Sequence, residues 1–168
     1  FKTGKKLVIT GTCVNENKLY YFNYINNPNM KIITSILISC CIPVLFTPIK
    51  YKKKLWVDGG ILNNYPINYF YKDIENTIGI AIFNKCYEKK NNIDNVLEYF
   101  KNLYNCIIYG YNDMNIHKYI NNTITFNHSF NSSFNFNVNK EFKNDYFNLG
   151  YKCAKKQKKK LNKFLSTN

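Results

Sequence analysis

Arginine is absent from this chain of 168 residues, so all 24 of its basic side chains are lysines. With only 10 acidic residues, the formal net charge is +14. Specific base reading and bidentate phosphate binding favour the planar arginine fork, whereas lysine acts as a hydrated point charge. The composition therefore argues against specific nucleic-acid recognition and favours diffuse attraction to anionic surfaces. Lysine, asparagine, isoleucine and tyrosine all have codons rich in A and T. A genome with that bias would give the same excess of these residues without any functional significance.

Metal-binding patterns are also missing. The six cysteines form no Cys-x-x-Cys pair, and His117 and His128 are the only histidines. A structural zinc site needs clustered ligands at short spacings, so neither a metal nor another cofactor is predicted. Most cysteines lie among apolar residues, which is typical of small buried side chains in a reducing compartment. We therefore expect a cytoplasmic protein that can lie peripherally on membranes.

A long uninterrupted hydrophobic run is lacking too. The longest apolar stretch, residues 32–49, contains Thr34, Ser35, Ser39 and Pro43, so it is a poor membrane span. No signal peptide is visible, and the chain opens at Phe1, so we expect a piece of a longer protein. Hydrophobic residues still make up 45% of the sequence, which is enough for one folded domain over residues 1–168.

Hydrophobic patterning predicts strands that alternate with helices. Strands are expected at Leu7–Thr10 and from Lys18 as a hairpin, on both sides of a lysine-rich turn before Asp58, at Thr77–Phe83 with both faces covered, and from Asn122. Helices are expected between Asn27 and Pro43, at Asp94–Gly110 and at Lys140–Leu165. This alternation indicates an α/β fold, a layered sheet with flanking helices.

All three helices have a predicted apolar face, which in the helix at Asp94–Gly110 consists of Val96, Leu97, Phe100, Leu103, Tyr104, Ile107 and Ile108. In the first, the apolar positions are Ile32, Ile33, Ile36, Leu37, Cys40 and Cys41, and in the last they are Phe142, Tyr146, Leu149 and Cys153.

The stretch "LWVDGGILNNYP", which begins at Leu55, contains the main candidate for chemistry. Asp58 follows an expected buried strand and precedes Gly59 and Gly60, which allow backbone geometries closed to other residues. An acid at the end of a buried strand is well placed for function in an open α/β sheet. Asp-Gly is also a common turn signal, so the motif taken alone favours a simple turn.

The wider order of features, from Leu7 to Phe70, resembles the patatin-like phospholipase family. A hairpin is followed by a helix, by a Pro-x-x-Phe-x-Pro pattern (Pro43, Phe46 and Pro48), and by the Asp-Gly-Gly motif with its trailing Asn64 and Pro66. The resemblance implies an α/β hydrolase that cleaves acyl esters of lipids through a Ser–Asp dyad, with Asp58 as the base. A carboxylate within hydrogen-bond reach can take the proton of a serine hydroxyl, which is a weak nucleophile by itself.

The serine half of such a dyad is not found in the sequence. The chain contains neither Gly-x-Ser-x-Gly nor a glycine-rich oxyanion loop. Both precede the aspartate motif in the family, so we expect residues 1–168 to be the C-terminal part of a patatin-like domain and to be inactive alone. Ser39 is not expected to replace the nucleophile, because a helical serine is usually packed or bonded to its own backbone.

Two lysine clusters remain to be interpreted. The cluster Lys50–Lys54 is expected at a hairpin tip roughly 15–20 Å from Asp58, too far for a direct role in chemistry. The C-terminal cluster is either a solvated helix end or a contact with anionic lipid head groups. Its members are Lys155, Lys156, Lys158, Lys159 and Lys160.

Three functions follow, in order of preference. The first is a hydrolase of phospholipids or other lipid esters, and the second is an inactive lipid- or membrane-binding protein on the same scaffold. The third is a basic nucleic-acid-binding module, whose binding would weaken steeply with salt.

Overall fold

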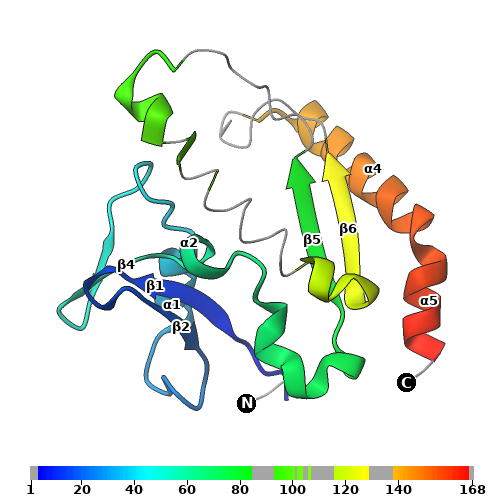
Figure 1. Ribbon diagram of the computed structural model, residues 1–168, viewed down its shortest axis with the longest axis horizontal. Coiled ribbons are helices and arrows are strands. Elements are labelled where there is room, and N and C mark those ends of the chain that lie inside the picture. Colours follow the sequence, from blue (N-terminus) through cyan, green and yellow to red (C-terminus); the bar gives the residue numbers. More distant parts are fainter. Residues whose placement is uncertain are drawn as a thin grey trace. The chain divides into compact units, whose positions relative to one another are not determined.

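The computed structural model describes residues 4–84, 93–100, 102–103, 106, 116–128 and 138–166. Helices and strands are mixed along the chain, which confirms the predicted α/β class. The chain divides into two compact units: residues 1–66 with 93–114, and residues 67–92 with 115–168 (Figure 1). The assignment of all 168 residues to part of one patatin-like domain stays a prediction.

The first unit contains a four-stranded antiparallel sheet with the strand order β2-β1-β4-β3. Its strands are β1 (Ile9–Cys13), β2 (Lys18–Phe22), β3 (Ile49–Tyr51) and β4 (Lys54–Asp58). Both predicted turns are confirmed. The short 3-10 helix η1 (Val14–Glu16) joins β1 to β2, and Lys52 and Lys53 form the β3–β4 turn with positive φ angles of 48° and 62°.

Helices lie on both faces of this sheet. Successive residues of β1 point to opposite sides, and two neighbouring residues, Thr10 and Gly11, contact different helical segments. A Cβ placed on Gly11 would lie 2.6 Å from Ile38 Cγ2 of α1 (Ile32–Ser39). A Cβ placed on Gly59, at the start of α2 (Gly60–Asn63), would lie against Thr10. The predicted sheet with flanking helices is therefore present in this unit.

The prediction for the first helix was wrong in two respects. The helix begins after Lys31 instead of Asn27, and residues 23–31 form turns, in which the Asn23 side chain accepts hydrogen bonds from two backbone N–H groups. The predicted apolar face is largely exposed, and the buried residues are Ser35 and Ile38. The reason is that Gly11 has no side chain, which leaves a groove on the sheet. Ile38 packs into this groove and so fixes the rotation of α1.

The core of the first unit lies between α1 and the sheet. It consists of Cys13, Phe22, Ile38 and Trp56, with the Trp56 ring 5.3 Å from that of Phe22. Cys41 is buried as expected, but Cys40 at the end of α1 is exposed, as is Cys106. The expectation of buried cysteines therefore fails for these two. Of the predicted helix at Asp94–Gly110, residues 96–100, 102, 103 and 106 are described and are helical, but its apolar positions Val96, Leu97, Phe100 and Leu103 are exposed. The other positions of its apolar stripe lie outside the described residues.

The second unit is built around the parallel pair β5 (Gly79–Asn84) and β6 (Thr123–His128). It also contains η2 (Pro66–Asn76, which starts at the unit boundary), η3 (Ile120–Asn122), α4 (Lys140–Lys156) and α5 (Lys158–Ser166). Ala81 is buried, but its neighbours Ile80 and Ile82 are exposed. The prediction that both faces of β5 are covered was therefore wrong for the face that bears Ile80 and Ile82. Among the described residues, α4 packs against the neighbouring strand β6.

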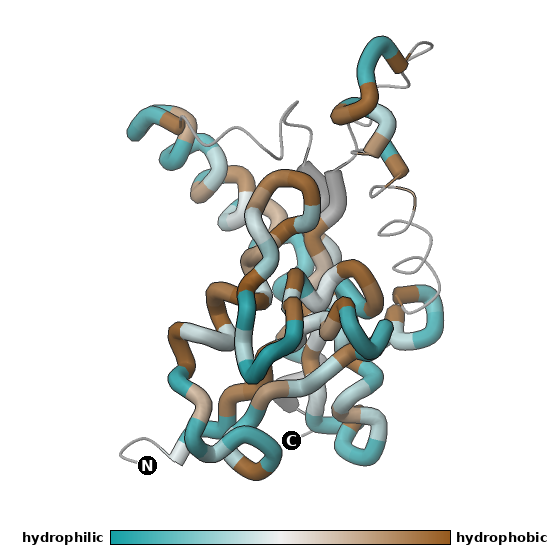
Figure 2. The backbone as a smooth tube through the Cα atoms, turned by 90° about the vertical axis from the view of Figure 1, so that its left-hand side faces the viewer, coloured by the Kyte–Doolittle hydropathy of each residue, from teal (hydrophilic) through white to brown (hydrophobic). Residues whose placement is uncertain are grey.

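The predicted C-terminal helix is divided in two at Gln157. The Gln157 side chain accepts a hydrogen bond from the backbone N–H of Thr125 (3.2 Å) and donates one to its carbonyl oxygen (2.5 Å). The predicted inner face of α4 is confirmed, since Phe142, Tyr146, Leu149 and Cys153 are all half-buried. Within the described part of the chain, no helix combines the length and the apolar composition needed to cross a bilayer, and hydrophilic residues recur along the backbone (Figure 2).

Candidate functional site

The backbone of Asp58 is held from two sides. Asp58 is the last residue of β4 and lies opposite Gly11 of β1 in the sheet register. Its N–H donates a hydrogen bond to the carbonyl oxygen of Cys41, 2.9 Å away, in the segment that follows α1. The strand and the helix therefore position this residue together.

One carboxylate oxygen of Asp58 shapes the turn that follows. Oδ1 accepts a hydrogen bond of 2.7 Å from the N–H of Gly60, the first residue of α2. This is the local bond by which aspartate stabilises tight turns. Among the described residues, none donates a hydrogen bond to the second oxygen, Oδ2. Asp58 thus stabilises the turn through Oδ1, as predicted, and Oδ2 is left to accept a hydrogen bond from another group.

The environment of Asp58 makes its carboxylate more basic. The residue is half-buried, and this burial raises the pKa of the carboxyl above its ordinary value, while the hydrogen bond from Gly60 lowers the pKa in part. Partial desolvation disfavours the charged form, which strengthens the affinity of the carboxylate for a proton. A general base benefits from that shift.

The two glycines after Asp58 differ in what surrounds them. A Cβ on Gly59 would lie 2.4 Å from Thr10 Oγ1 and 2.7 Å from the backbone carbonyl carbon of Thr10. A Cβ on Gly60 would meet only side-chain ends, Asn64 Oδ1 at 2.8 Å and Asp58 Oδ1 at 3.2 Å. Gly59 has an ordinary φ of −66°, so the close approach of β1, and not a special backbone conformation, requires glycine there.

Asn63 is a site residue that the sequence analysis missed. It is the last residue of α2, only 2% exposed, and its Nδ2 donates a hydrogen bond of 3.3 Å to the hydroxyl of Tyr21 on β2. The bond fastens α2 to the sheet and so supports the turn at Asp58. The sequence holds an Asn pair at this point, but nothing in it tells which of the two amides turns inward.

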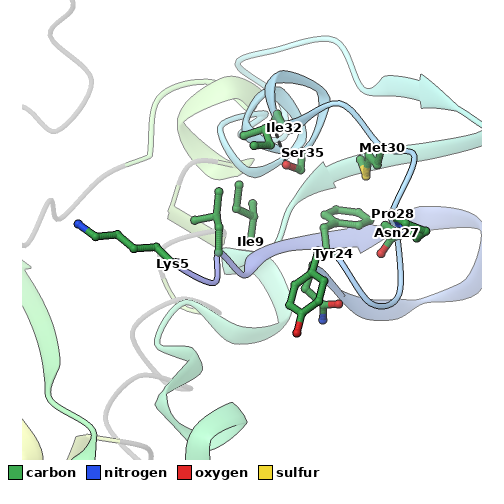
Figure 3. A pocket seen from close by; sticks show the side chains of 11 residues that line it. Lys5, Ile9, Tyr24, Asn27, Pro28, Met30, Ile32 and Ser35 are labelled. Carbon is green, nitrogen blue, oxygen red and sulfur yellow. Dashed lines mark hydrogen bonds between the residues drawn. The ribbon is translucent and has the colours of Figure 1, made fainter. Parts of the chain in front are cut away.

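An apolar hollow of about 360 Å³ lies on the α1 side of the sheet (Figure 3). Most of its lining is apolar and includes Leu7, Ile9, Phe22, Tyr24, Met30 and Ile32, while Asn23, Asn27 and Ser35 add polar groups. Lys5 also borders the hollow, but its side chain extends away from the other labelled residues in Figure 3.

The hollow lies at the end of the sheet where Asp58 is found. Ile9 precedes Gly11 by two residues on β1, about 7 Å along the strand, and Gly11 is the partner of Asp58. Residues two apart on a strand face the same side, so Ile9 shares the α1 side with Gly11.

Neither Ser39 nor the lysine turn before Asp58 has the geometry of a catalytic partner. Ser39 is the last residue of α1 and is not on a strand-to-helix turn. Lys52 and Lys53 occupy the turn at the opposite end of β4. Of the residues that the structure describes, no three His, Cys, Asp or Glu side chains gather in a geometry that could hold a metal ion.

The five C-terminal lysines do not behave alike. Lys155, Lys156, Lys158 and Lys159 are exposed. Lys160 is half-buried, and its ammonium donates hydrogen bonds to the carbonyl oxygens of Ile120 (2.6 Å) and Thr123 (2.5 Å). Lys160 therefore closes the turn at η3, a role that its place in a lysine run does not indicate.

Part of the chain is similar in sequence to known proteins. Residues 3–71 match the family model of patatin-like phospholipases. The chain is 37% identical over 90 residues to the probable lipid hydrolase 463L of Invertebrate iridescent virus 6. The aligned residues make up 54% of this chain and 28% of the viral protein.

Two further relatives carry no function in their names. They are the uncharacterized protein R571 of Acanthamoeba polyphaga mimivirus (34% identical, 48% of this chain and 27% of R571) and the uncharacterized protein YqhO of Bacillus subtilis (38% identical, 46% of this chain and 29% of YqhO). The chain thus spans less than a third of the length of each curated relative. The family match and the viral lipid hydrolase together support the patatin-like phospholipase family for residues 3–71, the segment that contains Asp58.

Proposed function

We propose that the complete protein is a lipid acyl hydrolase in which Asp58 is the base of a Ser–Asp dyad. The serine belongs to a part of the protein outside these 168 residues. The observation that carries the proposal is the half-buried carboxylate at the end of β4, with one oxygen fixed by Gly60 and a raised pKa. The match of residues 3–71 to the patatin-like family supports it.

The chemistry follows from these properties. Asp58 accepts the proton of the serine hydroxyl as the serine oxygen attacks the ester carbonyl carbon. The protonated Asp58 then gives the proton to the departing alcohol oxygen, which leaves the acyl group on the serine. Water then attacks the acyl carbon while Asp58 takes its proton, and Asp58 returns that proton to the departing serine oxygen, which releases the fatty acid and restores both groups. A carboxylate and a serine suffice for both steps, so no metal or cofactor takes part in the proposal.

The substrate is a phospholipid or another lipid ester, and its acyl chain occupies the hollow beside Ile9. The apolar lining offers contact to methylene groups, and the volume of about 360 Å³ lies within the usual range for small-molecule sites. Each methylene removed from water contributes about 0.8 kcal/mol to binding. Such a lipid lies in a membrane, so the proposal includes contact of the enzyme with a membrane surface.

The test is the Asp58→Asn variant of the complete protein, assayed on phospholipid and on a neutral-lipid ester. We expect kcat to fall by about 10²–10⁴-fold, the usual contribution of a general base. Folding should be retained, because the amide oxygen can still accept the hydrogen bond from Gly60. Asp145→Asn is the matched control, since it removes an exposed carboxylate of α4.

Two results would count against the proposal. Full activity of folded Asp58→Asn protein removes Asp58 from the mechanism. If the unaltered complete protein hydrolyses no lipid ester but binds lipid vesicles, the alternative of an inactive lipid-binding scaffold is correct.

A further inference from the structure

Helix α4 presents two large aromatic side chains to solvent. Phe147 is 74% exposed and Tyr151 is 64% exposed. They are four residues apart, as are the exposed Lys143 before them and Lys155 after them, so all four lie along one side of the helix. The half-buried side chains of α4 lie on a different face, so Phe147 and Tyr151 are not needed for its packing.

The charge around this pair is of one sign. After Asp145 the sequence contains no acidic residue up to its last residue, Asn168. In the same stretch, Lys152, Lys155, Lys156, Lys158 and Lys159 are all exposed. A shallow hollow of about 380 Å³ lies between the apolar side chains of Leu149 and Cys153 and three of these lysines. Lys155 thus lies on the side of α4 that carries the two rings, whereas Lys152 and Lys156 lie nearer to its half-buried side, beside Leu149 and Cys153.

We propose that this surface, the aromatic–lysine face, binds an anionic lipid membrane. It consists of Phe147, Tyr151 and Lys155 on one side of α4, together with the exposed lysines around that end of α4 and on α5, which are Lys152, Lys156, Lys158 and Lys159. The two rings enter the head-group region, where amphipathic aromatic side chains are stabilised, and the lysine ammonium groups contact lipid phosphates. Lysines close to a negatively charged leaflet attract it without a fixed geometry, which suits flexible and exposed side chains.

A membrane fits this face better than a nucleic acid does. The chain has no arginine for base or bidentate phosphate contacts, and an exposed phenylalanine with no polar tip gains from an apolar interior. The inference extends the proposed function, because a lipid hydrolase must reach lipid at its surface. Vesicle binding nevertheless needs neither Asp58 nor the dyad serine, so the two proposals can fail separately.

Lys160 provides an internal control. It belongs to the same lysine run, but its ammonium is bound to the carbonyl oxygens of Ile120 and Thr123 and is excluded from the aromatic–lysine face. Its replacement should affect the stability of the second unit and leave membrane binding unchanged.

The experiment measures co-sedimentation of the complete protein with phosphatidylcholine vesicles, with and without phosphatidylserine. The unaltered protein should bind the phosphatidylserine vesicles preferentially. Replacing Lys155, Lys156, Lys158 and Lys159 by glutamine should weaken that binding by about 10²–10³-fold, because each lysine near a charged leaflet contributes about 1 kcal/mol and about 1.4 kcal/mol corresponds to a tenfold change. Phe147→Ser with Tyr151→Ser should weaken binding and make the remainder more sensitive to salt.

Three controls make the outcomes decisive. Glutamine at the exposed Lys6, Lys31, Lys50 and Lys72 removes the same charge elsewhere in the chain and should leave binding nearly unchanged. Lys160→Gln and Asp58→Asn should also bind as the unaltered protein does. Circular dichroism checks that each variant is folded.

Several results would overturn the inference. Equal loss in the Lys6, Lys31, Lys50 and Lys72 variant would mean that net charge, and not this face, drives binding. Unchanged binding by the Phe147 and Tyr151 double variant would show that the two rings do not contact the membrane. Equal affinity for vesicles with and without phosphatidylserine would contradict an anionic partner. If the four-lysine variant loses binding to duplex RNA but not to vesicles, the face is a nucleic-acid surface instead.

Discussion

The Gly59→Ala substitution tests the close approach that builds the candidate site. Its new methyl carbon would lie 2.4 Å from Thr10 Oγ1, 2.5 Å from Thr10 Cβ and 2.7 Å from the backbone carbonyl carbon of Thr10. Real Cβ atoms do not come this near other heavy atoms, so β1 or the turn after Asp58 must move. Extra carbon atoms forced into a packed site typically cost 1–3 kcal/mol, about the range expected here for the free energy of unfolding.

The matched control is Gly60→Ala in the complete protein. Its methyl carbon would meet the end of the Asn64 side chain at 2.8 Å, and that side chain is exposed and can rotate away. We therefore expect a loss below about 1 kcal/mol for Gly60→Ala. Unfolding in urea, followed by circular dichroism, gives both values.

A double variant tests the share of the Thr10 hydroxyl in this clash. Adding Thr10→Ala to Gly59→Ala removes the hydroxyl but leaves the contacts with Thr10 Cβ at 2.5 Å and with its backbone carbonyl carbon at 2.7 Å, so stability should recover only in part. Gly59 and Gly60 variants of equal stability would refute the reasoning, because they would show that β1 does not approach Gly59 so closely.

Four further predictions concern the carboxylate, the second unit and the hollow. Burial raises the pKa of Asp58 above 3.8, so its contribution to stability is greatest below that pH and is lost as the pH rises through the folded-state pKa. Asp58→Asn should therefore gain stability relative to the unaltered protein as the pH rises, and urea unfolding at several pH values measures the difference. Lys160→Gln should lower the free energy of unfolding by about 1–3 kcal/mol, since it weakens hydrogen bonds from a charged group to two carbonyl oxygens. Gln157→Glu keeps the acceptor for the Thr125 N–H but places a carboxylate oxygen against the Thr125 carbonyl, so faster hydrogen exchange at the Thr125 amide is expected, and unchanged exchange would contradict the pairing. Leu7→Trp should narrow the hollow and shift hydrolysis toward shorter acyl chains, which a series of esters of increasing length would reveal.

Local sequence determined the parts of the fold that depend on neighbouring residues. The two hairpins, which turn at Asn17 and at Lys52–Lys53, could be predicted. In each of them a few turn-forming residues separate two short runs of strand-forming residues. The same holds for Asp58, whose place at the end of a strand follows from the apolar run Leu55–Val57 and the two glycines. The inner face of α4 also follows from the helical repeat alone.

Features that depend on distant residues were decided only by the tertiary structure. The apolar pattern of α1 is broad enough for several rotations, and the groove at Gly11 selects the one that buries Ile38. The raised pKa of Asp58 requires burial by surrounding elements, which no local pattern records. Lys160 differs from its lysine neighbours only because the carbonyl oxygens of Ile120 and Thr123, about 40 residues away in the chain, lie within reach of its ammonium group. Hydrophobic periodicity and turn chemistry fix secondary structure, whereas desolvation and long-range hydrogen bonds arise only when separate segments pack together.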